Sequence, residues 1–222
     1  MLTIFTAIGN LSLEKIDSGK RIPFVRVDPQ DCYAVCPHEL ILWSGLAFRI
    51  MTKNELQEYY NLATARQELP GKPDFDYILR RLLVRGIVVE GTGRTAVDAL
   101  YRLLGQLRIL PVKDRFHVRL FACIKLWLRG QLPLRRFLHY MQRPQNTPME
   151  ALLLKLVSES SFSVAQLIGY LDAGSRTDSS LDETPRTDSR DYVEYTALHH
   201  TQYPVLQGVA NLYLKKQILF LK

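Results

Sequence analysis

Apolar positions and helix-capping residues follow one another in the same order twice along the chain. The first copy starts at Pro37 and the second at Pro148, 111 residues later. The spacing between matched positions rises to 131 residues beyond a longer insert in the second copy. Because core-facing positions decide how elements pack, a repeated core pattern predicts two related folding units. The matched pairs are Glu39 with Glu150, Thr52 with Ser163, Glu55 with Gln166, Leu56 with Leu167, Tyr59 with Tyr170, Ile78 with Val209, Leu82 with Tyr213 and Ile87 with Ile218.

Within the first copy, the pattern predicts three helices followed by a strand. Thr52 and Glu55 have the spacing of a capping box, which starts the second helix. The third helix carries an apolar stripe at i, i+3, i+4, i+7 and i+8, which is typical of an amphipathic helix. Gly86 fits the C-terminal cap of this helix. Residues 87–90 are then expected to form a strand, and Gly91-Thr92-Gly93 a tight turn.

The chain divides into four segments. Residues 1–36 contain short alternating apolar runs and turn residues, which predict a small N-terminal β element. The first copy occupies residues 37–94, and residues 95–146 are expected to form a basic helical connector. The second copy, residues 147–222, includes an insert rich in Ser, Thr and Asp at 174–191, which predicts a disordered loop.

Three helices, a strand and a glycine turn resemble the winged-helix superfamily, and the two copies together resemble tandem winged-helix proteins. The resemblance covers residues 37–94 and 148–222, although no clear return strand follows the glycine turn. It implies a mainly α fold with small β elements, in which two winged-helix-like repeats are joined by the basic connector. In this superfamily the exposed face of the third helix and the tip of the wing contact DNA. The matching positions here are Tyr77, Arg80, Arg81 and Arg94.

Positive charge is concentrated between the two copies. The chain has a formal net charge of +7 at pH 7. Residues 99–146 contain ten basic side chains and one acidic side chain, a net charge of +9, whereas residues 1–98 are neutral overall. A basic segment attracts a polyanion and releases its counterions, which predicts binding of double-stranded DNA. We expect DNA contacts from Lys72, Tyr77, Arg80, Arg81, Arg94, Arg102, Arg108, Arg115 and Arg119.

Other observations favour a less specific interpretation of these residues. Arginines on a helix face are commonly solvated or paired with carboxylates. Asp74 and Asp76 suit the first turn of the third helix, but they repel phosphates. In the second copy, the predicted exposed face of the third helix is less basic and partly apolar, which favours contact with protein or self-association. These positions are Gln207, Gly208, Asn211 and Leu212.

No motif typical of catalysis or metal binding stands out. Gly91-Thr92-Gly93 lacks the third glycine of a dinucleotide-binding motif, and there is no P-loop. The cysteines Cys32, Cys36 and Cys123 are too few for a disulfide framework, and the spacing of the first two with His38 does not fit a zinc site. We therefore expect no enzyme activity, cofactor or metal. Because no apolar run reaches the length of a membrane span and no secretory signal is recognisable, we expect a cytoplasmic protein without membrane contact.

Together these features predict a DNA-binding protein, and more specifically a transcription regulator. In this interpretation the first copy and the basic connector engage DNA, and the second copy mediates dimerisation. A dimer then contacts paired half-sites. Two alternatives stay open: a tandem winged-helix scaffold that binds protein partners in a larger assembly, and a plasmid replication or partition protein.

Overall fold

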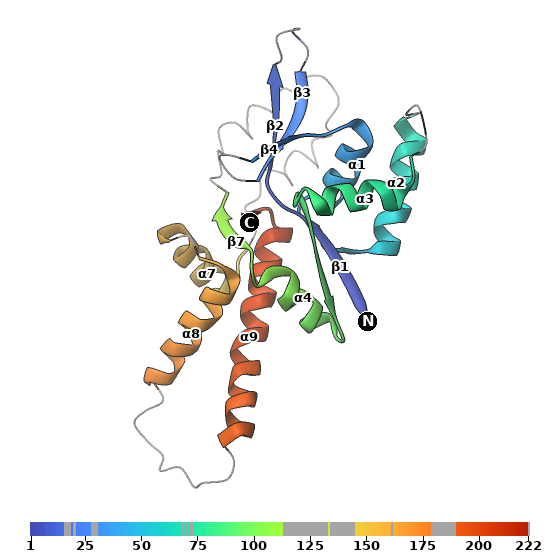
Figure 1. Cartoon of the computed structure of the whole chain (residues 1–222). Coiled ribbons are helices and arrows are strands. Elements are labelled where there is room, and N and C mark those ends of the chain that lie inside the picture. Colours follow the sequence, from blue (N-terminus) through green and yellow to red (C-terminus); the bar gives the residue numbers. More distant parts are fainter. Residues whose placement is uncertain are drawn as a thin grey trace.

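The computed structural model describes residues 1–15, 19, 21–27, 31–67, 69, 71, 73–112, 133, 145–160, 162–178 and 190–221, with the backbone alone for 173–178 and 190–201. Seven helices and eight strands lie within these residues (Figure 1). The strands are β1 (Leu2–Ala7), β2 (Asn10–Lys15), β3 (Arg21–Arg26), β4 (Cys32–Ala34), β5 (Met51–Thr52), β6 (Val88–Gly93), β7 (Arg108–Pro111) and β8 (Ile218–Leu221). The helices are α1 (Pro37–Leu46), α2 (Lys53–Gln67), α3 (Phe75–Val84), α4 (Ala96–Leu104), α7 (Pro148–Glu159), α8 (Val164–Asp178) and α9 (Arg190–Leu214).

The strands form three small sheets, in the orders β5-β1-β6, β2-β3-β4 and β7-β8. The prediction of two winged-helix repeats joined by a helical connector is therefore wrong. A wing requires a hairpin after the third helix, but β6 pairs along its whole length with β1, from Leu2 opposite Gly93 to Ala7 opposite Val88. The N-terminal strand thus occupies the middle of the first sheet.

Gly91 and Gly93 belong to β6 and do not form the predicted tight turn. A Cβ atom added at Gly91 would lie 2.4 Å from the carbonyl oxygen of Ala99, and one added at Gly93 would lie 2.3 Å from the Ala99 nitrogen. Ala99 belongs to α4, which packs directly on this strand. Glycine is needed here because the helix backbone approaches the strand more closely than a side chain allows.

The described part of the predicted connector contains a strand as well as a helix. Thr95 caps α4 by accepting a hydrogen bond from the Asp98 backbone at 3.1 Å. After α4, strand β7 pairs antiparallel with β8, from Arg108 opposite Leu221 to Pro111 opposite Ile218. This part of the connector therefore belongs to the folded core, while residues 113–132 and 134–144 lie outside the described residues.

The two halves share an order of elements without forming two winged helices. Helices α1, α2 and α3 precede β6, and α7, α8 and α9 precede β8. The predicted capping box at Thr52 is confirmed, because its backbone N–H donates to Glu55 at 2.7 Å. The Thr147 backbone N–H donates to Glu150 in the same way, at 2.9 Å. α8 extends to Asp178 and α9 begins at Arg190, so both ends of the predicted disordered insert are helical.

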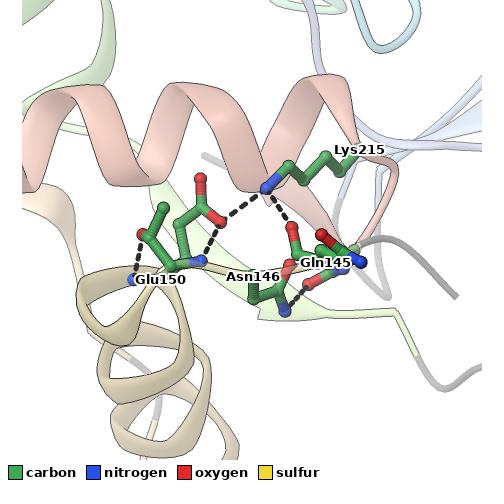
Figure 2. Close-up of polar contacts among 6 residues, drawn as sticks. Gln145, Asn146, Glu150 and Lys215 are labelled. Atoms are coloured by element: carbon green, nitrogen blue, oxygen red, sulfur yellow. Dashed lines mark hydrogen bonds and ion pairs between the residues drawn. The ribbon is translucent and has the colours of Figure 1, made fainter.

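A buried carboxylate lies at the same place in each half. Glu39 accepts from the Nε atom of Arg81 at 3.1 Å and from Nη1 of Arg85 at 3.2 Å. Glu150 accepts from Nζ of Lys215 at 2.6 Å, and Figure 2 shows Lys215 reaching from the end of α9 toward Glu150 and Gln145. Each carboxylate is 1% exposed. Each ion pair therefore ties the first helix of its half to the end of the third.

The Tyr213 side chain joins the two halves. Its hydroxyl accepts from the backbone N–H of Phe48 at 2.9 Å and donates to the carbonyl of Ala7 at 3.0 Å. Burial raises the pKa of this hydroxyl above its ordinary value. Buried residues from both halves form one hydrophobic cluster. The division of the chain at residues 36, 94 and 146 stays a prediction, but elements on either side of these positions share sheets and core.

Candidate functional site

Two residues predicted to contact DNA lie together on α3, beside acidic side chains. Tyr77 and Arg80 are exposed and line a depression of about 710 Å³ between α3 and the β1–β6 pair. The same depression is lined by Asp74, Asp76 and Glu90. Lys53 also lines it and pairs with Asp76 at 2.8 Å, so three carboxylates against two cations give this face little attraction for a polyanion.

Two further candidate arginines are paired with carboxylates. Besides its ion pair with Glu39, Arg81 lies 5.9 Å from the ring of Tyr77. Arg102 pairs with Asp98 one turn earlier on α4, at 2.9 Å. The ion-paired interpretation of the sequence therefore holds for both residues.

The other candidates do not gather at one place. Arg94 follows β6 and Arg108 lies on β7, and both are exposed. Lys72, Arg115 and Arg119 lie outside the described residues. The described candidates thus do not form one continuous basic surface.

A groove lies between α4 and α9, and Figure 1 shows α4 beside the upper part of α9 and slanting away from it. We call it the α4–α9 groove. It consists of two depressions of about 670 and 230 Å³ that share Val97, Tyr203 and Leu206 in their lining. Most of its lining is apolar, with polar residues at one end. The remaining lining residues are Ala96, Leu100, Tyr101, Gln207 and Ala210 along its length, and Arg94, Thr95, Asp98 and Gln202.

Helical spacing places these residues on facing surfaces. On α9, positions 203, 206, 207 and 210 recur at intervals of one turn and lie on one side of the helix. The opposite side of α9 is buried, with Val205 and Val209 in the core. On α4, Ala99 and Leu103 pack on β6 and leave Leu100 and Tyr101 for the groove. Each helix therefore keeps an apolar side that the core does not cover.

Two tyrosines and one arginine give the groove its chemical character. Tyr101 is 41% exposed and Tyr203 is 51% exposed, so both rings present apolar surface with a polar hydroxyl. The backbone N–H of Arg94 donates to Asp98 at 2.9 Å, while the Arg94 guanidinium has no ion pair with a described residue. Asp98 lines the same end and feels the Arg94 charge, but a cation without an ion pair at the end of an apolar groove suits a ligand that is apolar along its length and carries a carboxylate.

No family model, curated protein or solved structure matches the chain. No group of three possible metal-binding side chains occurs among the described residues. Within the same part of the chain, every helix is too short or too polar to cross a bilayer. The function is therefore argued from the geometry of the α4–α9 groove and from charge.

The sequence placed the apolar contact surface of the second half on the wrong side of α9. Gly208 and Leu212 were expected to be exposed, but both are buried. A Cβ atom at Gly208 would lie 2.7 Å from Cδ1 of Leu153, so this position packs against α7. Gln207 is exposed as expected and lines the groove. The spacing of Tyr203, Leu206 and Ala210 was the signal that could have identified the correct face.

Proposed function

We propose that the chain is a protein-binding module, and that the α4–α9 groove binds a helical segment of a partner protein. The apolar lining of the groove between two helices supports this proposal. Amphipathic helices bind such grooves through side chains spaced at i, i+3 or i+4, and i+7. This function corresponds to the scaffold alternative without its winged-helix fold. The cytoplasmic location expected from the sequence is part of the same proposal.

The groove favours a partner segment of defined chemistry. Val97 and Tyr203 lie in both depressions and offer apolar contact near the centre of the groove, over the buried side chain of Leu206. Arg94 lies at one end and is available for a carboxylate. We therefore expect the partner helix to present leucine or phenylalanine on one face and an Asp or Glu near the end that meets Arg94.

Replacement of Tyr203 by aspartate is expected to weaken peptide binding by about tenfold or more, since removing a buried tyrosine side chain from an interface commonly costs over about 1.4 kcal/mol. The probes are fluorescein-labelled helical peptides of about four turns with Leu or Phe at i, i+4 and i+7 and a terminal Glu. Binding is measured by fluorescence polarisation.

Tyr77→Asp provides the matched control. Tyr77 is about as exposed as Tyr203, but it lies on α3 and outside the groove. Affinity in this variant is expected to match that of the unmodified chain. Equal loss of affinity in both variants, or no saturable binding by any peptide of the set, contradicts the proposed groove.

A second candidate function is binding of double-stranded DNA, as a dimeric transcription regulator or a plasmid replication protein. The observation that favours it is the net charge of +9 in residues 99–146. The carboxylates beside Arg80 make α3 a poor DNA-reading helix, so the basic segment is the better candidate.

Neutralising the basic segment is expected to lower the salt dependence of duplex binding. Replacing Arg108, Arg115 and Arg119 by glutamine should reduce the log–log salt slope by about 1 for each of these arginines that neutralises a phosphate. The Arg80→Gln variant, which leaves the ion pair of Arg81 with buried Glu39 intact, should bind as tightly as the unmodified chain. Duplex binding measured across salt concentrations tests both the DNA function and the segment that contacts DNA. Absence of any salt-sensitive affinity excludes DNA binding. Weaker binding by the α3 variant alone assigns the DNA contact to α3.

A further inference from the structure

Strand β2 is an edge strand with exposed leucines. It pairs with β3 on one side, and no described strand pairs with its other side. Leu11 is 39% exposed and Leu13 is 63% exposed, on the same face of the strand. Figure 1 shows the β2–β3 hairpin projecting beyond the helices. A long apolar edge strand is a template for pairing with another strand.

The position of Pro23 shows which backbone groups of β2 are unpaired. Leu13 lies opposite Pro23, which has no backbone N–H. The carbonyl of Pro23 accepts from the backbone N–H of Val35 at 3.1 Å and so points away from β2. In an antiparallel pair, a residue whose backbone groups point away from the neighbouring strand exchanges no hydrogen bonds with the residue opposite it, so Pro23 and Leu13 form a pair without hydrogen bonds. The N–H and C=O groups of Leu13, and by alternation those of Leu11 and Lys15, therefore point toward the free edge.

The end of this edge near Gly9 is already occupied. The Gly9 backbone N–H points to the same side and donates to the carbonyl of Phe220 at 2.9 Å. An added strand can therefore use Leu11, Leu13 and Lys15, but not Gly9.

We propose that β2 pairs antiparallel with β2 of a second copy of the chain, with Leu13 opposite the second copy's Leu13 across a twofold axis. This register uses all three outward-facing residues of each strand and leaves Gly9 with Phe220. A register centred on Ser12 requires the Gly9 N–H, which is not free. The two β2–β3–β4 sheets then form one continuous sheet.

Side chains agree with this register. Leu13 lies opposite Leu13 of the second copy. Leu11 lies opposite Lys15 of the second copy, whose alkyl stem covers apolar surface. On the other face, Ser12 lies opposite Glu14, and a hydroxyl can donate to a carboxylate. Glu14 is already neutralised by Arg26 in its own chain, at 3.0 Å. The edge is thus complementary to itself, which favours a second copy over an unrelated strand.

Sedimentation velocity over a range of concentrations tests the dimer. The unmodified chain is expected to show a monomer–dimer equilibrium, and Leu13→Lys is expected to weaken it by about tenfold or more because it places like charges at the axis. Leu62→Lys is the matched control, since Leu62 is similarly exposed but lies on α2. A monomer at every concentration, or equal weakening by both substitutions, overturns the proposal.

Disulfide cross-linking tests the register. Cys32, Cys36 and Cys123 are first replaced by serine. Leu13→Cys should then form a cross-linked dimer under oxidation, because facing Cα atoms in a hydrogen-bonded pair are about 5.5 Å apart. Ser12→Cys should not, because the two Ser12 residues are offset diagonally by more than about 7 Å. Preferential cross-linking of Ser12→Cys overturns this register. The peptide-binding groove is separate from β2, so failure of either proposal leaves the other standing.

Discussion

Replacing Lys215 with methionine is expected to lower the free energy of unfolding by about 3 kcal/mol at neutral pH. The substitution keeps the apolar stem but leaves Glu150 buried with no cation, and with the Thr147 N–H at 2.9 Å and the Asn211 side chain as its hydrogen-bond partners. Removing one partner of a buried ion pair is costly because the remaining charge has no compensation. The expected decrease is at the lower end of the usual range because Lys215 is partly exposed. The change in the free energy of unfolding is measured by urea denaturation, with unfolding monitored by circular dichroism.

Lys216→Met is the control for this substitution. Lys216 is the next residue, is exposed, and lies 6.0 Å from the ring of Phe48. Its replacement should cost no more than about 1 kcal/mol, the value of an exposed cation–π contact. If the two variants are destabilised equally, the ion pair with Glu150 does not contribute as argued.

The effect of Lys215→Met also depends on pH. Burial by itself raises the pKa of Glu150, but the hydrogen bonds from Lys215 and Thr147 outweigh burial and hold it below the ordinary value of 4.5. The stability from this group is therefore present above about pH 4.5 and is lost as pH falls through the lowered pKa. Without Lys215 the buried carboxylate favours its protonated form. The difference in stability between the two proteins should shrink as pH falls from 7 to 4.

Gly93→Ala is expected to lower the free energy of unfolding by about 2–3 kcal/mol, because it forces α4 away from β6. The new methyl group would meet the Ala99 nitrogen at 2.3 Å and the Asp98 carbonyl carbon at 2.7 Å. Both are backbone atoms of α4, so no side-chain rotation relieves the clash. Thermal unfolding by circular dichroism compares the variant with the unmodified protein.

Gly169→Ala is the opposite case and serves as the control. Gly169 lies in α8, and no heavy atom would be within 4 Å of an added Cβ. Alanine is favoured over glycine in a helix by about 0.5–1 kcal/mol. The two substitutions should therefore change the melting temperature in opposite directions, and a stabilising Gly93→Ala would show that α4 does not pack on β6 as described.

The sequence predicted features that depend on neighbouring residues. The capping box at Thr52 is present because its hydrogen bonds with Glu55 span three positions. Gly86 caps α3 with φ of 66°, a backbone conformation that glycine adopts without strain. The stripe on α3 also faces the core, with Ile78 and Leu82 buried. These features are local, so one short stretch of sequence contains the information.

The winged-helix prediction failed where the structure depends on distant segments. The strand at residues 87–90 was expected to end in a tight turn, but β6 continues to Gly93 and pairs with β1, which is more than 80 residues earlier. The sequence Gly91-Thr92-Gly93 is typical of a turn. The structure shows instead that glycine is needed at positions 91 and 93 because the backbone of α4 lies too close for a side chain.

The candidate site could be predicted only in part, for the same reason. The exposed residues Tyr77 and Arg80 are on the expected face of α3, but the neutralisation of Arg81 by Glu39 links different helices. The α4–α9 groove brings together positions near 100 and 206, and no local pattern relates them.

The central place of β1 in its sheet has a consequence during synthesis on the ribosome. β1 is made before β5 and β6, so one of its edges stays unpaired until residue 52 has left the exit tunnel and the other until residue 93 has left it. The contact between Ala7 and Tyr213 spans 206 residues and can form only after residue 213 has left the tunnel. Such long-range pairing slows folding and leaves strand edges open to aggregation. Strand β1 is therefore open to pairing with other chains for longer than a strand whose partners follow closely in sequence.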